Sequence, residues 1–312
     1  MTERFAILCP GQGGQHAAMF DLLRNDVRGA EILHGYALEQ RLGHPLDVLL
    51  QDDRLLFANR HAQPLVAAAG LAAWQALTMD SEFPAPHLVA GYSIGELTAY
   101  GVAGSMPATT VIDLAIARAG YMDACLRDEP QQGLMSVGGL PVEEAAAVLR
   151  QHNAHVAIQT GFDTLIAGGR NADLLAAGRQ CETRGARTGM LPVGIASHTP
   201  LMASASAPFS TALNAIAFDP PAIAVLAGIS AQEVHDKDTA KRSLVEQLTT
   251  TIQWSACMDA CAERGITVAL ELGPGSALSR MLRERHPGIE CRSLSDFRSL
   301  AGASKWLQSR LG

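Results

Sequence analysis

The pentapeptide Gly91-Tyr92-Ser93-Ile94-Gly95 places a serine between two glycines in the pattern G-x-S-x-G. Glycines at these positions allow the sharp, strained turn that exposes a serine hydroxyl above a sheet. An apolar run at 87–90 predicts a short buried strand before the turn, and the residues after it favour a helix. Ser93 is therefore the candidate nucleophile, and a purely structural turn is the alternative interpretation.

Ile94 would be the first residue of the helix that follows the serine. Backbone N–H groups in the first turn of a helix have no partner within the helix, and the helix dipole favours negative charge there. The Ile94 amide is thus a candidate donor to the oxyanion that forms when a serine attacks a carbonyl.

A serine hydroxyl needs a base, and His198 follows Ser93 in the chain order that serine-dependent α/β enzymes use. A surface or core histidine is the ordinary interpretation of any one of the ten histidines. The apolar segment 191–193 predicts a strand shortly before His198, which would place this residue in a loop at the end of a strand. That position makes His198 the candidate general base.

Arg118 falls on the apolar face of the helix predicted over 107–126. A guanidinium in such a place is costly unless it meets an anion. A substrate carboxylate or a protein Asp or Glu would satisfy it, and the sequence leaves both possibilities open. A bidentate pair with a bound carboxylate would contribute about 1.5–3 kcal/mol and would reject neutral acyl groups.

The order of short strands and helices predicts one discontinuous domain with an insertion. Residues 5–9 form a strand candidate that ends in Pro10-Gly11-Gln12-Gly13-Gly14, and a helix is expected over 65–77. Strands near 134–137, 156–159, 165–167 and 188–193, with helices at 142–151 and 172–184, give a ferredoxin-like rhythm. The larger unit resumes with strands at 222–227 and 268–271 and a helix near 244–250. We expect a large domain of residues 1–128 and 197–312 and a small domain of residues 129–196.

Composition limits the classes of function. The 312 residues are 48% hydrophobic and 18% charged, with mean hydropathy +0.11, which is typical of a globular chain with a sizeable core. The net charge of −7 disfavours nucleic acid and anionic membranes as partners. The six cysteines show no metal-ligand spacing, so we expect packed, reduced thiols and no bound metal. No signal peptide or membrane span is evident, which predicts a cytoplasmic protein.

A family resemblance becomes specific when the motifs are taken together. They are Pro10 to Gln15, Gly91 to Glu96, Arg118, Ser197-His198, Gln247-Leu248, Gln253-Trp254, and Glu271 to Gly275. In this order, and over nearly the whole chain, they resemble malonyl-CoA:acyl-carrier-protein transacylases. An accidental coincidence of all of them is improbable.

The resemblance implies a role for each matching residue. Ser93 would carry a malonyl ester, His198 would activate Ser93 and then the incoming thiol, and Arg118 would hold the malonyl carboxylate. The amides of Gln12 and Ile94 would form the oxyanion hole, and the Gln247 carbonyl would orient the imidazole. The resemblance also implies an α/β-hydrolase-like large domain with an inserted ferredoxin-like small domain, malonyl-CoA as substrate, an acyl carrier protein as partner, and no bound cofactor.

Two positions depart from the family pattern. Tyr92 stands where the family commonly has histidine, and Gln159-Thr160-Gly161 replaces a stretch similar to Asn-Ser-Pro. Tyrosine before the nucleophile resembles the epsilon subunit of malonate decarboxylase, which we favour over a transacylase of fatty-acid or polyketide synthesis. A serine hydrolase of the same fold and a non-catalytic carrier-binding scaffold are the further alternatives.

Overall fold

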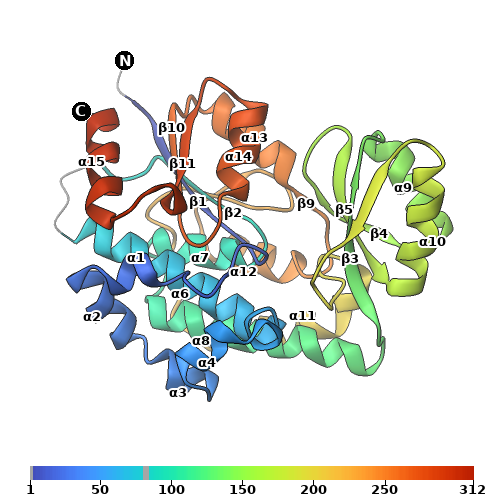
Figure 1. Cartoon of the computed structure of the whole chain (residues 1–312), viewed down its shortest axis with the longest axis horizontal. Coiled ribbons are helices and arrows are strands. Elements are labelled where there is room, and N and C mark those ends of the chain that lie inside the picture. The colour runs from blue at the N-terminus through green and yellow to red at the C-terminus, as the bar shows by residue number, and fades with distance from the viewer. Residues whose placement is uncertain (1–2, 80–83) are drawn as a thin grey trace.

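A computed structural model describes residues 3–79 and 84–312. Within these residues the strands form two sheets, a larger one and a smaller one that lie side by side (Figure 1). The larger sheet has the order β11-β10-β1-β2-β7-β8, and all neighbouring pairs are parallel except β7 with β8. Its strands are β1 (Phe5–Cys9), β2 (Leu88–Gly91), β7 (Val225–Leu226), β8 (Glu233–Val234), β10 (Val268–Glu271) and β11 (Glu290–Ser293).

Helices cover both faces of the larger sheet, so its central strand is buried on both sides. Phe5, Ile7 and Cys9 of β1 belong to the core formed with α6, α7 and α8. Ala6 and Leu8 point the other way, into the core formed with α13 and α14. A continuous apolar run is what a parallel strand covered on both faces requires, which explains why residues 5–9 show no polar alternation.

The helices of the larger part precede and follow these strands in the chain. They are α1 (Asp21–Arg24), α2 (Val27–Gly35), α3 (Leu38–Leu42), α4 (Leu46–Gln51), α5 (Asp53–Leu56), α6 (Asn59–Thr78), α7 (Ile94–Val102), α8 (Ala108–Ala124), α11 (Ala203–Asn214), α12 (Lys237–Glu246), α13 (Trp254–Glu263), α14 (Ala277–Arg285) and α15 (Leu300–Leu311). Short 3-10 turns are η1 (Cys125–Arg127), η2 (Pro200–Met202) and η3 (Leu294–Asp296).

The smaller sheet has the order β6-β3-β5-β4-β9. Its first four strands belong to one contiguous segment with two helices: β3 (Gln132–Gly138), α9 (Val142–Gln151), β4 (His155–Gln159), β5 (Thr164–Arg170), α10 (Asn171–Glu182) and β6 (Arg187–Met190). The helices α9 and α10 pack on one face of this sheet around their own apolar core (Figure 1). The fifth strand, β9 (Ile252–Gln253), comes from the later part of the chain and pairs in parallel with β4.

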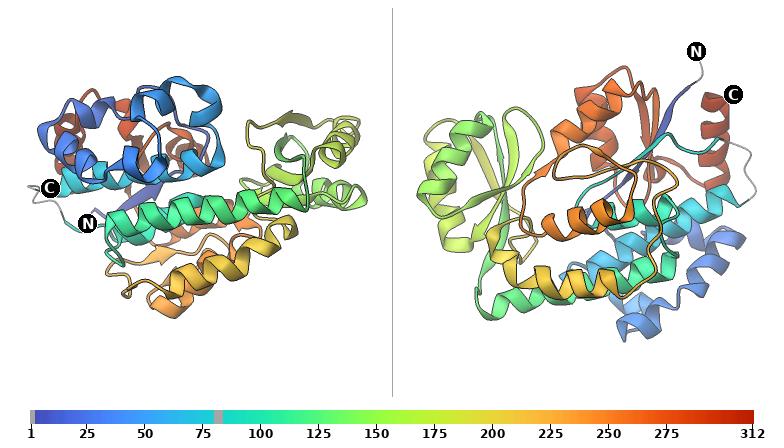
Figure 2. Two further views of the ribbon diagram at one scale, coloured as in Figure 1. Left: turned by 90° about the horizontal axis from the view of Figure 1, so that it is seen from below. Right: turned by 180° about the vertical axis from the view of Figure 1, so that it is seen from behind.

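The helix α8 connects the two parts of the molecule. It runs beneath the larger sheet against α6 and α11 and reaches toward the smaller sheet (Figure 2). The chain then passes through η1 into β3. Arg118 lies on the buried face of this helix, as the spacing of its apolar residues predicts.

Several predicted elements have the bounds that the sequence indicates, including β1, α9 and β10. The prediction of a strand at 191–193 is wrong, because β6 ends at Met190 and Val193 N–H instead closes a tight turn onto the Leu191 carbonyl. Pro192 has no N–H for a ladder, which works against continuing the strand. The helix expected near 244–250 ends at Glu246, because the next carbonyls bond to His198.

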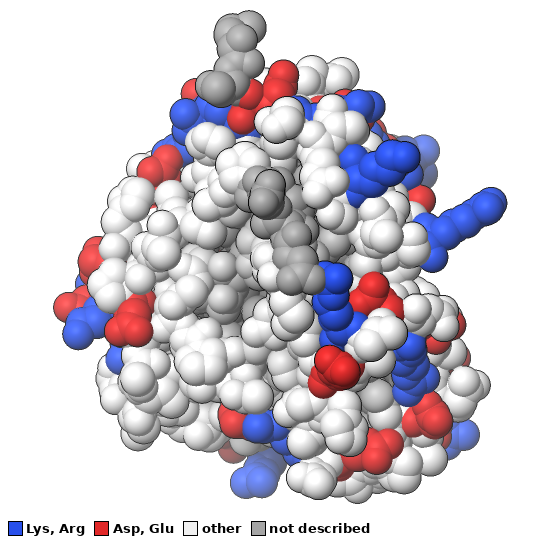
Figure 3. Space-filling view, turned by 90° about the vertical axis from the view of Figure 1, so that its left-hand side faces the viewer, with Lys and Arg blue, Asp and Glu red and all other residues white. Residues whose placement is uncertain are grey.

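The face seen in Figure 3 shows acidic and basic side chains interspersed among uncharged ones. Mixed charge of this kind gives no single-signed field over that face. Among the described helices, none combines the length and hydrophobicity needed to cross a bilayer.

Replacing Gly95 by alanine should destabilise the fold. An added Cβ would lie 2.0 Å from the Cys9 carbonyl oxygen, so α7 and β1 would have to separate. We expect Gly95→Ala to lower the free energy of unfolding by at least about 1–3 kcal/mol, measured by urea denaturation.

Gly120→Ala is the matched control, because nothing lies within 4 Å of a Cβ at this exposed position in α8. Alanine should stabilise that helix by about 0.5–1 kcal/mol. Equal stability changes in the two variants would contradict the close approach at Gly95.

Candidate active site

Ser93 lies in the turn between β2 and α7, at the carboxyl end of the larger sheet. Its backbone has φ 58° and ψ −118°, a strained conformation for a residue with a side chain. Both flanking glycines are needed for this turn, because a Cβ at Gly91 would lie 2.2 Å from the Glu96 nitrogen and one at Gly95 would strike β1. The local sequence therefore folds as G-x-S-x-G predicts.

His198 lies against Ser93. The distance from its Nε2 to the Ser93 Oγ is 2.8 Å, and its Nδ1 lies 2.6 Å from the Gln247 carbonyl oxygen. Because a carbonyl only accepts, Nδ1 carries the proton and Nε2 has a free lone pair facing the hydroxyl. His198 also has positive φ (62°), and its backbone N–H donates to the Leu248 carbonyl. Serine and histidine thus form a dyad oriented by a main-chain oxygen.

The imidazole of His198 stays neutral over the ordinary pH range. Burial, and then the nearby positive charge of Arg118, lower the pKa of His198 to about 3, while the bond to the Gln247 carbonyl acts in the opposite direction. A neutral imidazole with its lone pair toward the hydroxyl is the form required of a general base.

Arg118 is buried, with 1% of its surface exposed. Its Nη1 donates to the Gln63 Oε1 at 2.7 Å and its Nη2 to the Gln247 Oε1 at 3.1 Å. These partners are neutral amides, and in the described part of the chain Arg118 makes no ion pair with Asp or Glu. Burial lowers its pKa to about 10, which still leaves it charged at neutral pH. The site therefore presents a positive charge that no contacting carboxylate neutralises.

The two amides that hold Arg118 belong to a longer chain of polar contacts. Gln63 Nε2 donates to Asn59 Oδ1 at 2.6 Å, and Gln12 Nε2 donates to the same oxygen at 3.0 Å. At the other end, Gln247 Nε2 donates to Glu96 Oε2 at 2.5 Å. A continuous series of hydrogen bonds therefore connects six residues: Gln12, Asn59, Gln63, Arg118, Gln247 and Glu96.

The backbone around Ser93 offers donors for an oxyanion. Within the described residues, the N–H groups of Ile94 and Gln12 have no hydrogen-bond partner. The loop after β1 lies close to the serine turn, because a Cβ at Gly11 would meet the Tyr92 carbonyl oxygen at 2.8 Å and the Ser93 Cβ at 3.6 Å. Unpaired amides beside a nucleophile can stabilise developing negative charge.

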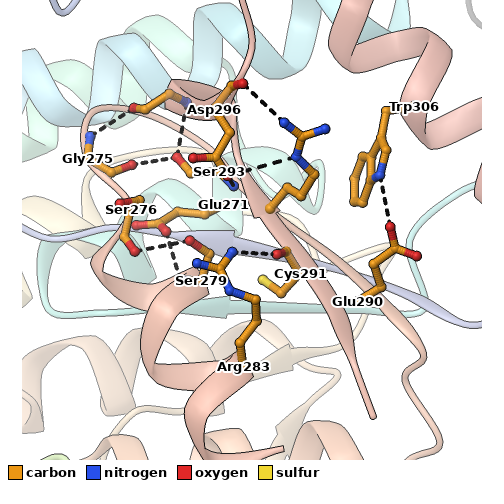
Figure 4. A network of polar contacts seen from close by, with 12 residues as sticks. Glu271, Gly275, Ser276, Ser279, Arg283, Glu290, Cys291, Ser293, Asp296 and Trp306 are labelled. Carbon is orange, nitrogen blue, oxygen red and sulfur yellow. Dashed lines mark hydrogen bonds and ion pairs between the residues drawn. The ribbon is translucent and has the colours of Figure 1, made fainter. Parts of the chain in front are cut away.

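The segment 271–275 supports the loop after β1. A Cβ at Gly14 would lie 2.4 Å from the Pro274 carbonyl oxygen, so the two loops touch through their backbones. Figure 4 shows how the second loop is held: Glu271 accepts hydrogen bonds from the Leu278 and Ser279 amides at the start of α14, and the Ser293 hydroxyl donates to the Gly275 carbonyl. The contacts of this part of the motif are therefore structural.

Comparisons with known proteins agree with this geometry. The model of a family described as acyl transferase domain matches residues 6–295. The chain belongs to this acyl transferase family.

Similar proteins match this acyl transferase over nearly its whole length. It is 28% identical over 292 residues to the malonyl CoA-acyl carrier protein transacylase of Mycobacterium bovis, covering 93% of this chain and 95% of that protein. It is 26% identical over 311 residues to the enzyme of the same name from Salmonella typhimurium, covering 97% and 99%. The crystal structure of malonyl-CoA:acyl carrier protein transacylase from Xanthomonas oryzae pv. oryzae has a TM-score of 0.89 at 28% identity, covering 99% of each chain. The protein is an acyltransferase with the mixed α/β fold of these structures.

All six predicted site residues lie in one connected arrangement: Gln12, Ser93, Ile94, Arg118, His198 and Gln247. Sequence reasoning missed Asn59, Gln63 and Glu96. For Asn59 and Gln63 the available signal was an amide pair four residues apart on an alanine-rich helix, where a buried glutamine needs a partner. The described residues contain no group of three or more His, Cys, Asp or Glu suited to a metal, and Cys257 and Cys261 are buried in the core.

The pH dependence of Ser93 reactivity should report the charge of Arg118. Because the pKa of His198 is lowered, the imidazole becomes protonated only in strongly acidic solution. Between about pH 5 and pH 8, protonation of His198 should therefore not slow the labelling of wild-type Ser93 by a fluorophosphonate. Arg118→Gln removes a positive charge that lowers the His198 pKa. The fall of the labelling rate at acidic pH should therefore begin at a higher pH in the variant. A fall at the same pH in both proteins would contradict the electrostatic coupling between Arg118 and His198.

Proposed function

We propose that this acyl transferase moves a malonyl group from malonyl-CoA to the thiol of an acyl carrier protein through an ester on Ser93. The observation that carries the proposal is the buried charge of Arg118, which no carboxylate contacts, in the same polar network as the Ser93–His198 dyad. A malonyl group has the free carboxylate that such a guanidinium binds. The names of the full-length relatives support the same donor and acceptor.

The first half of the reaction follows from the geometry of the dyad. His198 Nε2 takes the Ser93 proton as Oγ attacks the thioester carbonyl, and the charge on the carbonyl oxygen is met by the amides of Ile94 and Gln12. The Gln247 carbonyl holds the imidazolium through Nδ1–H. Collapse of the tetrahedral intermediate breaks the C–S bond, and the coenzyme A thiolate takes the proton from His198. In the second half a carrier thiol gives its proton to His198 and attacks the ester carbonyl. Collapse of this second intermediate breaks the bond between the acyl carbon and Ser93 Oγ, and Oγ takes the proton back from His198.

The substrate carboxylate has a second effect in this mechanism. Arg118 lowers the pKa of His198, so a bound carboxylate that pairs with Arg118 would offset that charge and make the imidazole more basic. A neutral acetyl group would gain neither the ion pair nor the stronger base.

As part of the same proposal, the carrier is that of malonate decarboxylase, with this chain as the epsilon subunit. Tyr92 supports it, because tyrosine before the serine resembles the epsilon subunit, whereas the transacylases commonly have histidine there. The Tyr92 ring packs edge-on against Trp254, with 5.3 Å between the ring centroids. A transacylase of fatty-acid or polyketide synthesis is the second candidate, supported by the relatives' names.

The proposal extends to the organisation of the chain. We assign residues 1–128 and 197–312 to an α/β-hydrolase-like domain and residues 129–196 to a ferredoxin-like domain. The mostly parallel larger sheet and the order β-α-β-β-α-β around the smaller sheet support these names. A cytoplasmic location is supported by the six cysteines, which are all unpaired thiols and buried.

The first experiment is the intact mass of the protein after brief exposure to malonyl-CoA. The wild type should gain one malonyl group and Ser93→Ala none, because the ester needs the hydroxyl. Subsequent discharge by a malonate decarboxylase carrier would support the epsilon-subunit assignment, and discharge only by a fatty-acid carrier would support the second candidate. Free malonate without transfer would indicate a hydrolase, and no mass gain would contradict the proposed function.

Replacing Arg118 by alanine should impair malonyl loading far more than acetyl loading. The lost charge-assisted contact is worth about 1.5–3 kcal/mol, so the ratio of the two acylation rates should fall at least about tenfold. Rapid-quench time courses of Ser93 acylation with malonyl-CoA and with acetyl-CoA measure this ratio. Equal losses for both donors would exclude a carboxylate contact at Arg118.

A further inference from the structure

Glu96 is a buried carboxyl group that the steps described above do not use. It lies in the first turn of α7, three residues after the nucleophile, and is fully buried. Its Oε2 accepts from the Gly228 backbone N–H at 3.0 Å and from the Gln247 Nε2 at 2.5 Å. No partner of its Oε1 lies among the described residues. Burying a carboxyl group with an unpaired oxygen costs free energy, so the contacts of Glu96 require an explanation.

The direction of each hydrogen bond gives that reason. Arg118 can only donate, so the Gln247 amide must turn its oxygen toward Arg118 and its NH₂ toward Glu96. An acceptor at the Glu96 position selects this orientation of the amide, whereas a donor there would favour the flipped amide, with its NH₂ facing the guanidinium. The orientation of Gln247 that holds Arg118 thus depends on a group that accepts at Glu96.

Glu96 does this without touching Arg118. In the described part of the chain these residues form no ion pair, and the Gln247 amide lies between them. A direct ion pair would occupy guanidinium N–H groups and compete with a substrate carboxylate. Burial raises the pKa of the Glu96 carboxyl to about 7, while the Gly228 and Gln247 donors and the charge of Arg118 favour the anion.

We propose that Glu96 is a positioning residue that acts through the Gln247 side chain to hold Arg118 for the carboxylate of the acyl group. This rests on the proposed function, since it assigns to Glu96 a part in choosing acyl groups that carry a carboxylate. Among the described residues, the Glu96 carboxyl group forms no hydrogen bond with Ser93 or His198, so its effect is on selectivity more than on the reactivity of the dyad.

The test is the ratio of Ser93 acylation rates with malonyl-CoA and acetyl-CoA in Glu96→Met. Methionine has a length similar to that of glutamate but no strong acceptor, so the Gln247 NH₂ loses its partner. The Gln247 oxygen is then no longer held against Arg118, and the ratio should fall about tenfold, as for one hydrogen bond to a charged group. Fluorophosphonate labelling, which needs Ser93 but no acyl carboxylate, should change less than about threefold.

Glu271→Met is the matched control. Glu271 is also buried, its pKa is also raised to about 7, and it also accepts two N–H groups, but it does so at the start of α14 (Figure 4). The control variant should lose stability and keep the malonyl-to-acetyl ratio of the wild type. An equal fall of the ratio in both variants would assign the effect to lost stability and overturn the proposal.

Two further variants keep the test decisive. If Glu96→Met does not fold, Gly228→Ala displaces the carboxylate without removing it, because the added Cβ would lie 2.9 Å from Glu96 Oε2, and the ratio should again fall. The double variant Glu96→Met/Gln247→Ala should have the same ratio as Gln247→Ala within about twofold, since both changes interrupt the same pathway. Independent, additive losses would overturn the pathway through Gln247.

The wild-type measurement separates this proposal from the proposed function. A wild-type protein that shows no preference for malonyl-CoA would overturn both. A wild type that prefers malonyl-CoA, together with a Glu96→Met variant that keeps the full preference, would overturn only the role of Glu96.

Discussion

The charge of Arg118 is removed from water without a carboxylate in contact with it, and the surrounding polar groups are arranged to make this possible. Carbonyl oxygens of two glutamine side chains face the guanidinium, and the NH₂ group of each amide must then find its own acceptor. Asn59 and Glu96 supply these acceptors. A buried charge held by neutral oxygens keeps its attraction for an anion, which a protein ion pair would have consumed.

The positions of Ser93 and His198 depend on an unusual backbone conformation. Both residues have positive φ, a strained conformation that persists only where the surrounding structure imposes it. The strands β1 and β2 end side by side, so the loop that contains Gln12 and the turn that contains Ser93 meet at one edge of the larger sheet. The loop at 273–275 then packs against the first of these through glycine backbones.

Segments that carry the site also join the two sheets. The helix α8 bears Arg118 and leads into β3, while the chain that contains Gln247 continues into β9, which pairs with β4 of the smaller sheet. The position of the Arg118 charge therefore depends on segments that also hold the smaller sheet against the larger one. Burial of apolar residues on both faces of β1 anchors the larger sheet, and the smaller sheet has its own core.

Local patterns were sufficient for much of this molecule. Three features depend on neighbours in the chain, so the sequence by itself determined them: the glycine spacing around Ser93, the apolar runs of β1 and of residues 268–270 in β10, and the amphipathic helix α9. The same holds for Arg118, whose burial follows from helical periodicity. The strand predicted at 191–193 failed because a turn at Pro192 ends β6 early.

Other features depend on residues that are far apart in sequence, and only the tertiary structure decided them. The partners of Arg118, the end of α12 at Glu246 and the pairing of β9 with β4 all arise from such contacts. The sequence does not identify the hydrogen-bond partner of a buried amide or carboxyl group. Its hydrogen bonds are directional, however, so its role is defined only when the fold places a donor or an acceptor against it.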